Sequence, residues 1–293
     1  MPYTDYPCPT GRPRKSLLSQ EEFTPIITIS RGSYSHGKEV AEKLCARLGY
    51  ECVSREIILK ASAHFNTPEI KLARAIHDAP SILDRFTFGK ERYTAYVQEA
   101  LLNHLRKDNV VYHGLAGHFF VQGISHAIKV RIIADFEDRV AEEMQREGIS
   151  SEQASKALSR DDEERRRWSA HLYGIDTRDA SLYDLVIHIK PLTTDDAVEL
   201  IYQAARRPCF QVTAQSMEAV KTLFLAAQVR AALVQEIPNA RVTVEKGEIV
   251  VSTSGYWAEG KKLTARIDQV IDTEKEGVKV KVRLINKPLK HGV

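Results

Sequence analysis

The chain has 293 residues, 43% of them apolar and 28% charged, with a net charge of +3. This length allows one large domain or two ordinary ones, and the composition is that of a soluble globular protein. The low net charge gives no argument for nucleic-acid binding, and no apolar run reaches the roughly 20 residues of a membrane-spanning helix.

The N-terminal residues 1–22 contain several prolines and basic residues but lack the apolar centre of a secretory signal. We expect them to form a flexible arm. The four cysteines form no C-x-x-C pair, so they are predicted to be reduced cysteines of a cytoplasmic protein. They are Cys8, Cys45, Cys52 and Cys209.

The first predicted strand, residues 26–29, ends in a loop of Ser, Gly and Arg that enters a helix at Lys38. Gly32, Gly37 and Lys38 fit the spacing G-x-x-x-x-G-K of a phosphate-binding loop. Glycines let backbone N–H groups turn toward an anion, while the helix N-terminus and the lysine add positive charge. Glu39 departs from the pattern, because a Ser or Thr hydroxyl normally holds Mg²⁺ at this position.

Strands then alternate with helices as far as residue 206. Strands are expected at residues 26–29, 50–53, 109–113, 129–134 and 183–189. Helices are expected at residues 38–48, from 55, largely over 66–107, at 135–147, from 150, and at 193–206. This alternation predicts an α/β fold with a parallel sheet covered by helices on both faces.

The pattern changes after residue 208. An amphipathic helix is expected at residues 216–236, a hairpin at 239–244 and 248–253, a helix at 256–273 and a strand at 277–285. This α-β-β-α-β order predicts a small α+β domain. The chain is therefore divided into an arm (1–22), an α/β domain (23–208) and a C-terminal domain (209–293).

Ligands of parallel α/β sheets bind beyond the carboxyl ends of the strands. The first three strands deliver to that edge the loop with Lys38, the pair Ser54 and Arg55, and His113 with the loop at 114–117. His113 is either a base or a structural histidine. The charged helix around residues 160–167 is either a lid that brings arginines to a phosphate or a solvated face.

An aromatic cluster near residue 90 also has two interpretations, packing against the rest of the protein or stacking on a nucleotide base. It consists of Phe86, Phe88, Tyr93 and Tyr96.

Several stretches together resemble the cytidylate-kinase-like family, a branch of the P-loop nucleoside monophosphate kinases. They are 27–31, 37–44, 48–50 with 55–58, 161–166, 181–187 and 196–201. The resemblance spans residues 26–205 and implies a P-loop kinase-type five-stranded parallel sheet. It also implies ATP- and Mg²⁺-dependent phosphorylation of a nucleoside monophosphate, CMP or dCMP by default.

The resemblance assigns roles by position in the motifs. The catalytic residues would be Lys38, Arg160, Arg165 and Arg166. The ATP-binding residues would be Arg31, Gly32, Ser33, Ser35, Gly37, Lys38, Glu39 and Arg139, with Glu39 also near the metal. The acceptor-binding residues would be Ser54, Arg55, Gly114 and Leu115.

The chain departs from the family pattern on the acceptor side. The family commonly has an acidic residue at position 54 and an arginine at position 115, where this chain has Ser54 and Leu115. Two hypotheses follow: a nucleoside monophosphate kinase, or a nucleotide-binding regulatory protein descended from such kinases.

The C-terminal domain resembles BON-type domains more weakly. That resemblance implies binding of a small anionic ligand or a membrane surface, for which the basic strand residues Lys279, Lys281 and Arg283 are suited. A solvated sheet face is the alternative. Homo-oligomer formation stays open.

Overall fold

The computed structural model describes residues 25–32, 35–54, 89–114, 117–246, 248–253, 265–267, 269 and 279–284. A five-stranded sheet, in the order β2-β3-β1-β4-β5, forms its centre, and every neighbouring pair is parallel. The strands are β1 (Ile26–Arg31), β2 (Glu51–Ser54), β3 (Val110–His113), β4 (Ala127–Ala134) and β5 (Leu185–Ile189). The predicted parallel sheet is therefore confirmed.

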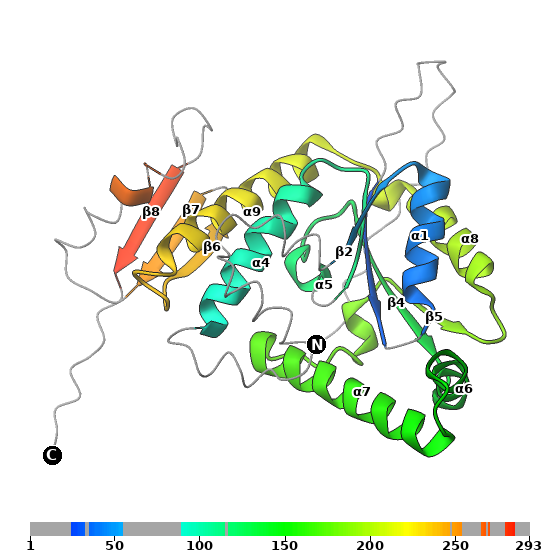
Figure 1. Ribbon diagram of the computed structural model, residues 1–293. Coiled ribbons are helices and arrows are strands. Elements are labelled where there is room, and N and C mark those ends of the chain that lie inside the picture. The colour runs from blue at the N-terminus through cyan, green and yellow to red at the C-terminus, as the bar shows by residue number, and fades with distance from the viewer. Residues whose placement is uncertain are drawn as a thin grey trace, which may run out of the picture.

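Helices cover both faces of this sheet (Figure 1). They are α1 (Gly37–Leu48), α4 (Gly89–Leu105), α5 (Gly117–Phe120), α6 (Phe136–Glu147), α7 (Ser151–Tyr173), α8 (Thr194–Ala205) and α9 (Ala214–Leu233). Short 3₁₀ turns at Ala180–Leu182 and Pro208–Phe210 join the elements. The helix expected from residue 55 and the first part of the one expected over 66–107 lie outside the described residues.

Alternation along the strands sorts side chains between two apolar cores. Ile27 and Ile29 of β1 face a core shared with α1 and α8. Ile26 faces the opposite core, built with α4, α5 and α9. β1 thus lies in the middle of the protein, and its carboxyl end is held between the two helical layers.

Helix α7 runs along one side of the molecule and packs against α6 (Figure 1). It begins with a capping box, in which the Ser150 hydroxyl accepts from the Gln153 N–H and the Gln153 side chain accepts from the Ser150 N–H. It ends at Gly174, whose φ of 69° lies in the left-handed region that suits glycine. The charged segment around residues 160–167 is therefore part of one continuous helix beside the sheet.

Helix α9 is apolar on two sides, which corrects the expectation of an amphipathic helix at residues 216–236. Val220 and Phe224 pack into the α4 core. Leu225 and Val229 pack against the C-terminal sheet. Because both sides are covered, α9 connects the α/β sheet to the C-terminal unit.

The C-terminal sheet has the order β6-β7-β8, with β6 (Arg241–Glu245), β7 (Glu248–Thr253) and β8 (Lys279–Leu284). The predicted hairpin is confirmed as the antiparallel pair β6–β7, and β8 adds to β7 in parallel. Of the helix expected at 256–273, the described residues 265–267 and 269 are helical. In the described part of the chain, no helix has the length and apolar character needed to span a membrane.

The aromatic cluster contributes to packing where the structure describes it. Tyr93 and Tyr96 are buried, and Tyr93 meets Trp168 of α7 edge to face with 4.9 Å between ring centroids. Phe86 and Phe88 lie outside the described residues. Tyr93 therefore joins α4 to α7.

Candidate functional site: an arginine-lined cavity at the carboxyl edge of the sheet

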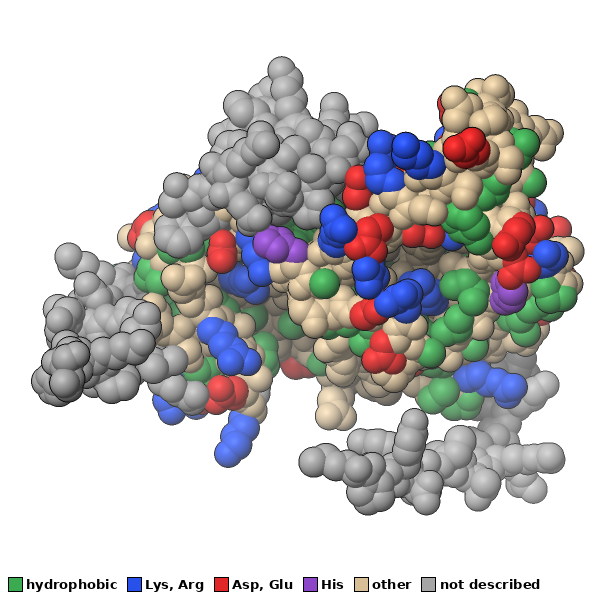
Figure 2. All heavy atoms as spheres, turned by 90° about the horizontal axis from the view of Figure 1, so that it is seen from below, with side chains coloured by type: hydrophobic (Ala, Val, Ile, Leu, Met, Phe, Trp, Pro, Cys, Tyr) green, Lys and Arg blue, Asp and Glu red, His purple; other side chains and the backbone are tan. Residues whose placement is uncertain are grey.

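A cavity of about 510 Å³ lies where β1 and β4 end, between the glycine loop and α7. Six of its lining residues are arginines, and two are acidic. Figure 2 views the molecule from the side of α7, where Lys and Arg side chains alternate with Asp and Glu. The lining residues are Ser30, Arg31, Gly32, Ser35, Arg131, Ile133, Ala134, Phe136, Arg139, Ser159, Asp162, Glu163, Arg165, Arg166, Thr177 and Arg178.

The first half of the glycine loop faces this cavity. The buried Ser35 hydroxyl donates to the Gly32 carbonyl at 3.2 Å, which closes the loop on itself. Gly37 begins α1 beneath the Arg31 side chain, and a Cβ at this position would lie 2.6 Å from the Arg31 Cβ. The close approach of Arg31 therefore explains why position 37 holds glycine.

Ion pairs hold the part of α7 that lines the cavity, one to α6 and others within α7 itself. Arg139 of α6 donates two hydrogen bonds, each 2.9 Å, to the two carboxylate oxygens of Asp162. The Arg139 side chain is only 10% exposed, so this forked pair ties α7 to α6 in a protected environment. Glu163 accepts from Arg166 and Arg167, and these hydrogen bonds lower the pKa of Glu163.

The predicted lid arginines separate into two groups. Arg165 and Arg166 line the cavity. Arg160 does not line it: its side chain is 71% exposed and lies 3.7 Å from Glu164. Arg139 also lines the cavity, and it reaches α7 through Asp162.

The second half of the loop points to the surface instead. The Lys38 side chain is 64% exposed, and its Nζ lies 3.7 Å from the Glu42 carboxylate. Glu39 accepts at 2.9 Å from Lys43 and at 2.9 Å from the Thr194 hydroxyl. The hydrogen bond from Lys43 is the main cause of a lowered pKa of Glu39. Neither Lys38 nor Glu39 lines the cavity.

The described carboxylates do not fit a resident Mg²⁺ site. Asp162 and Glu163 are engaged by arginines, and Glu39 is engaged by Lys43. Within the described ranges, no three His, Cys, Asp or Glu side chains gather as metal ligands would. The structure therefore does not place Glu39 as a metal ligand.

The acceptor side is described only in part. Ser54 ends β2 in register with His113, and Gly114 follows directly beside the Tyr112 ring. Three predicted site residues, Ser33, Arg55 and Leu115, lie outside the described residues. Neither Ser54 nor Gly114 lines the arginine cavity.

His113 lies on the α1 face of the sheet, and the structure favours its structural interpretation. It is 7% exposed and interacts with Cys52 of β2. Hydrogen bonds from the Cys45 thiol and from His113 lower the pKa of Cys52. The described cysteines are free thiols, as predicted.

Sequence reasoning missed a polar network on the opposite face of the sheet, around the Tyr183 hydroxyl. This hydroxyl donates to the Thr177 carbonyl at 2.9 Å and accepts from the Arg131 guanidinium at 3.3 Å. Ser30 Oγ and His118 Nε2 lie 3.3 and 3.4 Å from it. Of these residues, Ser30, Arg131 and Thr177 line the cavity. No motif assigns them a role, and strand register brings Ser30 beside Arg131.

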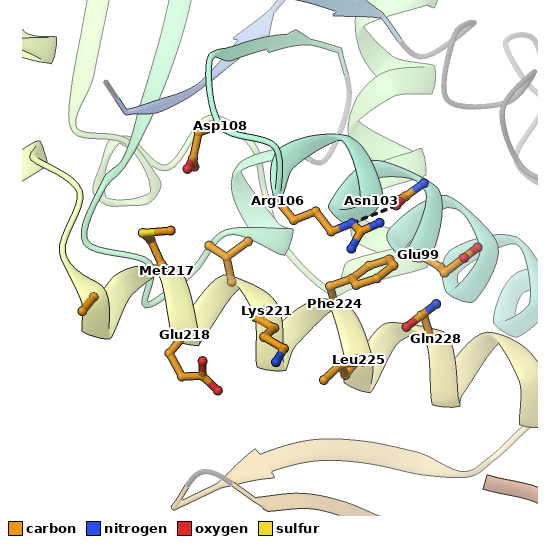
Figure 3. Close-up of a pocket in the computed structure, with 12 residues that line it drawn as sticks. Glu99, Asn103, Arg106, Asp108, Met217, Glu218, Lys221, Phe224, Leu225 and Gln228 are labelled. Atoms are coloured by element: carbon orange, nitrogen blue, oxygen red, sulfur yellow. Dashed lines mark hydrogen bonds between the residues drawn. The ribbon is translucent and has the colours of Figure 1, made fainter. Parts of the chain in front are cut away.

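A second cavity, of about 680 Å³, lies between α4 and α9 (Figure 3). Its cations are Arg106 and Lys221, and its acids are Glu99, Asp108 and Glu218. Arg106 is held by Asn103 and lies over the Phe224 ring at 4.5 Å. No described residue of the glycine loop lines this cavity, and its three acids outnumber its two cations, so it is the poorer phosphate site.

The family profile that matches this sequence is the "Cytidylate kinase-like family", over residues 26–191, more than half of the chain. A cytidylate kinase of Ignicoccus hospitalis is 26% identical over 177 residues, covering 60% of this chain and 96% of that protein. An uncharacterized protein from Eubacterium ventriosum aligns with a TM-score of 0.47 and 20% identity, over 62% of this chain and 99% of that one. Shikimate kinase from Acinetobacter baumannii aligns with a TM-score of 0.37 and 15% identity, over 62% and 93%. Both structural likenesses are partial, so the assignment rests on the profile: the chain belongs to the cytidylate kinase-like family.

Proposed function

We propose that this protein is a cytoplasmic nucleoside monophosphate kinase that transfers the terminal phosphate of ATP to a CMP-like acceptor. Membership of the cytidylate kinase-like family supports nucleotide phosphoryl transfer in general. The observation that carries the proposal is the cavity beside Gly32 and Ser35, which six arginines line at the carboxyl edge of a parallel sheet.

Phosphoryl transfer requires positioning and positive charge over the transferring oxygens more than covalent help from the protein. In the proposal, Arg165 and Arg166 contact these oxygens, and Arg139 holds α7 in place through Asp162. The backbone of residues 32–37 surrounds the donor phosphates, with Arg31 and Ser35 on the cavity side. In this proposal, Mg²⁺ binds together with the ATP phosphates and is not held by protein carboxylates in their absence.

Lys38 takes part in this proposal by a change of rotamer. Its pair with Glu42 is exposed, and such pairs contribute less than about 1 kcal/mol. Breaking the Lys38–Glu42 pair therefore costs little free energy, and the flexible Lys38 side chain can turn toward a phosphate bound at the start of α1. Ser54, Arg55, Gly114 and Leu115 stay the proposed acceptor residues.

A regulatory nucleotide-binding protein is the second candidate. Two observations favour it: Leu115 stands where the family carries an arginine, and the described carboxylates do not fit a metal site. Such a protein would bind ATP in the same cavity without transferring phosphate. In either case we propose that the BON-like C-terminal unit serves in sensing an anionic ligand or in localisation.

The test follows ADP release by the purified protein with ATP, Mg²⁺ and a panel of nucleoside monophosphates. We expect turnover with a pyrimidine monophosphate, lost in Arg165→Met and kept in Arg47→Met, whose arginine contacts Glu199 on the far side of the sheet. ATP binding without turnover would establish the regulatory candidate instead. Absence of ATP binding would contradict both candidates.

A further inference from the structure

Arg131 differs from other arginines of the cavity in its contacts. Arg139, Arg166 and Arg178 each form an ion pair with an aspartate or a glutamate. Arg131 donates from Nη1 to the Tyr183 hydroxyl, and its guanidinium carbon lies 5.6 Å from the centroid of the same ring. In the part of the chain that the structure describes, no carboxylate forms an ion pair with Arg131.

The lack of a carboxylate partner among the described residues is unusual for an arginine in the position of Arg131. It lies in the interior of β4, where Val130 and Ile132 on either side are fully buried in the opposite core. Its own side chain is half-buried and borders the cavity. Lys129, two residues earlier on the same face, has a carboxylate partner, Asp184, at 2.9 Å.

Removing a charge from water is costly unless an opposite charge compensates it. Lys129 has that compensation within the chain, and Arg131 lacks it among the described residues. A guanidinium that faces a cavity lined with further arginines is complementary to an oxyanion, because its planar fork matches two phosphate oxygens.

The Tyr183 hydroxyl fixes where the Arg131 guanidinium lies. A carbonyl oxygen can only accept, so the single hydroxyl proton of Tyr183 goes to Thr177, 2.9 Å away. The Tyr183 oxygen then accepts from Arg131. Since Thr177 and Arg178 follow α7 and also line the cavity, this hydroxyl links the β4 cation to the segment after the lid helix.

His118, which lies beside the Tyr183 hydroxyl, is neutral and therefore adds no charge to that of Arg131. It is 2% exposed, and burial, followed by repulsion from Arg131 and Lys129, lowers the pKa of His118 to about 3. A neutral imidazole neither competes with the guanidinium for an anion nor adds a second charge.

We propose that Arg131 forms a phosphate-binding subsite at the sheet side of the cavity, with Tyr183 as the residue that positions it. The ligand is a phosphate group of the bound nucleotide, so the identity of the ligand, though not the subsite, rests on the proposed kinase function. No motif of the sequence assigns either residue to the site.

The direct probe is inorganic pyrophosphate, titrated calorimetrically into the full-length protein at low ionic strength. We expect Arg131→Met to weaken binding roughly ten- to a hundredfold, the effect of losing a charge-assisted contact. The pyrophosphate affinity of Arg131→Lys should lie between those of wild type and Arg131→Met, because an ammonium keeps the charge but not the planar fork of the guanidinium. The control is Arg47→Met, which also removes an arginine stacked on a tyrosine (4.1 Å over Tyr202) but should leave binding unchanged.

A double-mutant cycle tests the positioning role. Tyr183→Phe keeps the ring and should weaken pyrophosphate binding at least threefold in the wild-type background. In the Arg131→Met background the same change should have no further effect on affinity, because the residue acts through Arg131. An equal effect in both backgrounds would assign Tyr183 a structural role only.

Two outcomes overturn the subsite: equal pyrophosphate affinity of Arg131→Met and wild type, or no binding by the wild-type protein. The ADP-release assay separates this result from the proposed function. Arg131-dependent pyrophosphate binding without turnover on any monophosphate would leave the subsite standing while the kinase proposal fails. Turnover with an unchanged KM for ATP and for the monophosphate in Arg131→Met would refute the subsite alone.

Discussion

The loop between β1 and α1 has two halves with different surroundings. Arg31, Gly32 and Ser35 border the arginine cavity, in a position fixed by the sheet and by the hydrogen bond of Ser35 to Gly32. Lys38 and Glu39, only a few residues later, belong to surface ion pairs with Glu42 and Lys43. The first half faces the cavity as it stands, whereas Lys38 and Glu39 would have to change conformation to reach it.

The same contrast separates the arginines of α7. Arg165 faces the cavity and Arg160 faces solvent, although they are five residues apart on one helix. A pattern of charges along a helix does not say which of them reaches a ligand. The position of each arginine on the helix circumference decides whether it reaches the cavity. Variants of Arg165 and Arg160 can therefore be compared directly.

The largest effect is expected for Arg165→Met. Loss of a cation that contacts the transferring phosphate should lower kcat roughly a hundredfold or more, while ATP affinity falls less than tenfold. The matched variant Arg160→Met should change kcat less than threefold. Steady-state kinetics and ATP titration measure both, and similar losses in the two variants would refute the division of α7 into two faces.

The next effect concerns the ion pair that holds α7 against α6. Asp162→Asn removes the carboxylate that accepts both hydrogen bonds from the largely buried Arg139. We expect the free energy of unfolding to fall by about 2 kcal/mol, measured by denaturant titration. Glu164→Gln, beside the exposed Arg160, is the control and should cost much less. Equal losses would mean that the Arg139 pair is no stronger than a surface contact.

A pH effect tests the buried network behind the cavity. The pKa of His118 is about 3 in the folded protein instead of its ordinary 6.5. Below pH 6.5, His118 is protonated in the unfolded chain but stays neutral in the folded protein. The free energy of unfolding therefore falls by about 1.4 kcal/mol for each pH unit between pH 6.5 and pH 3.

Above pH 6.5, His118 is neutral in both states and no longer affects how the free energy of unfolding changes with pH. His118→Gln should therefore lose about 2 kcal/mol less than wild type between pH 7 and pH 5. Denaturant titrations at the two pH values measure the difference. An identical loss in both proteins would show that His118 is not held neutral.

The smallest effect belongs to the surface half of the loop. Glu42→Gln releases Lys38 from its exposed partner, and ATP affinity should rise by at most about fivefold. In a Lys38→Met background the same change should give no gain. A gain that persists without Lys38 would show that Glu42 acts on the nucleotide by general repulsion and not through the lysine.

The sheet could be predicted from the sequence because its signals are local. Buried strands rich in β-branched residues, capping residues such as Ser150, and closing glycines such as Gly148 locate most elements to within about two residues. The sequence does not indicate the second apolar face of α9, because that face depends on two packing partners that lie far apart in the chain.

The candidate site was predictable only in part, for the same reason. The spacing of Gly32 and Gly37 identifies the loop, but it does not specify the direction of the Lys38 side chain. Arg131 carries no local signal, because charges at alternate positions of a strand, here Lys129 and Arg131, are typical of a solvated face. Its role depends on the register with Ser30 and on the distant Tyr183, which only the folded chain brings together.

The most direct test is a crystal structure of the protein with ADP. We expect phosphate oxygens within hydrogen-bond distance of Arg131 and Arg165, with the loop from Gly32 to Gly37 around them. Phosphates bound in the cavity between α4 and α9, or at the surface beside Lys38 without contact to these arginines, would contradict it.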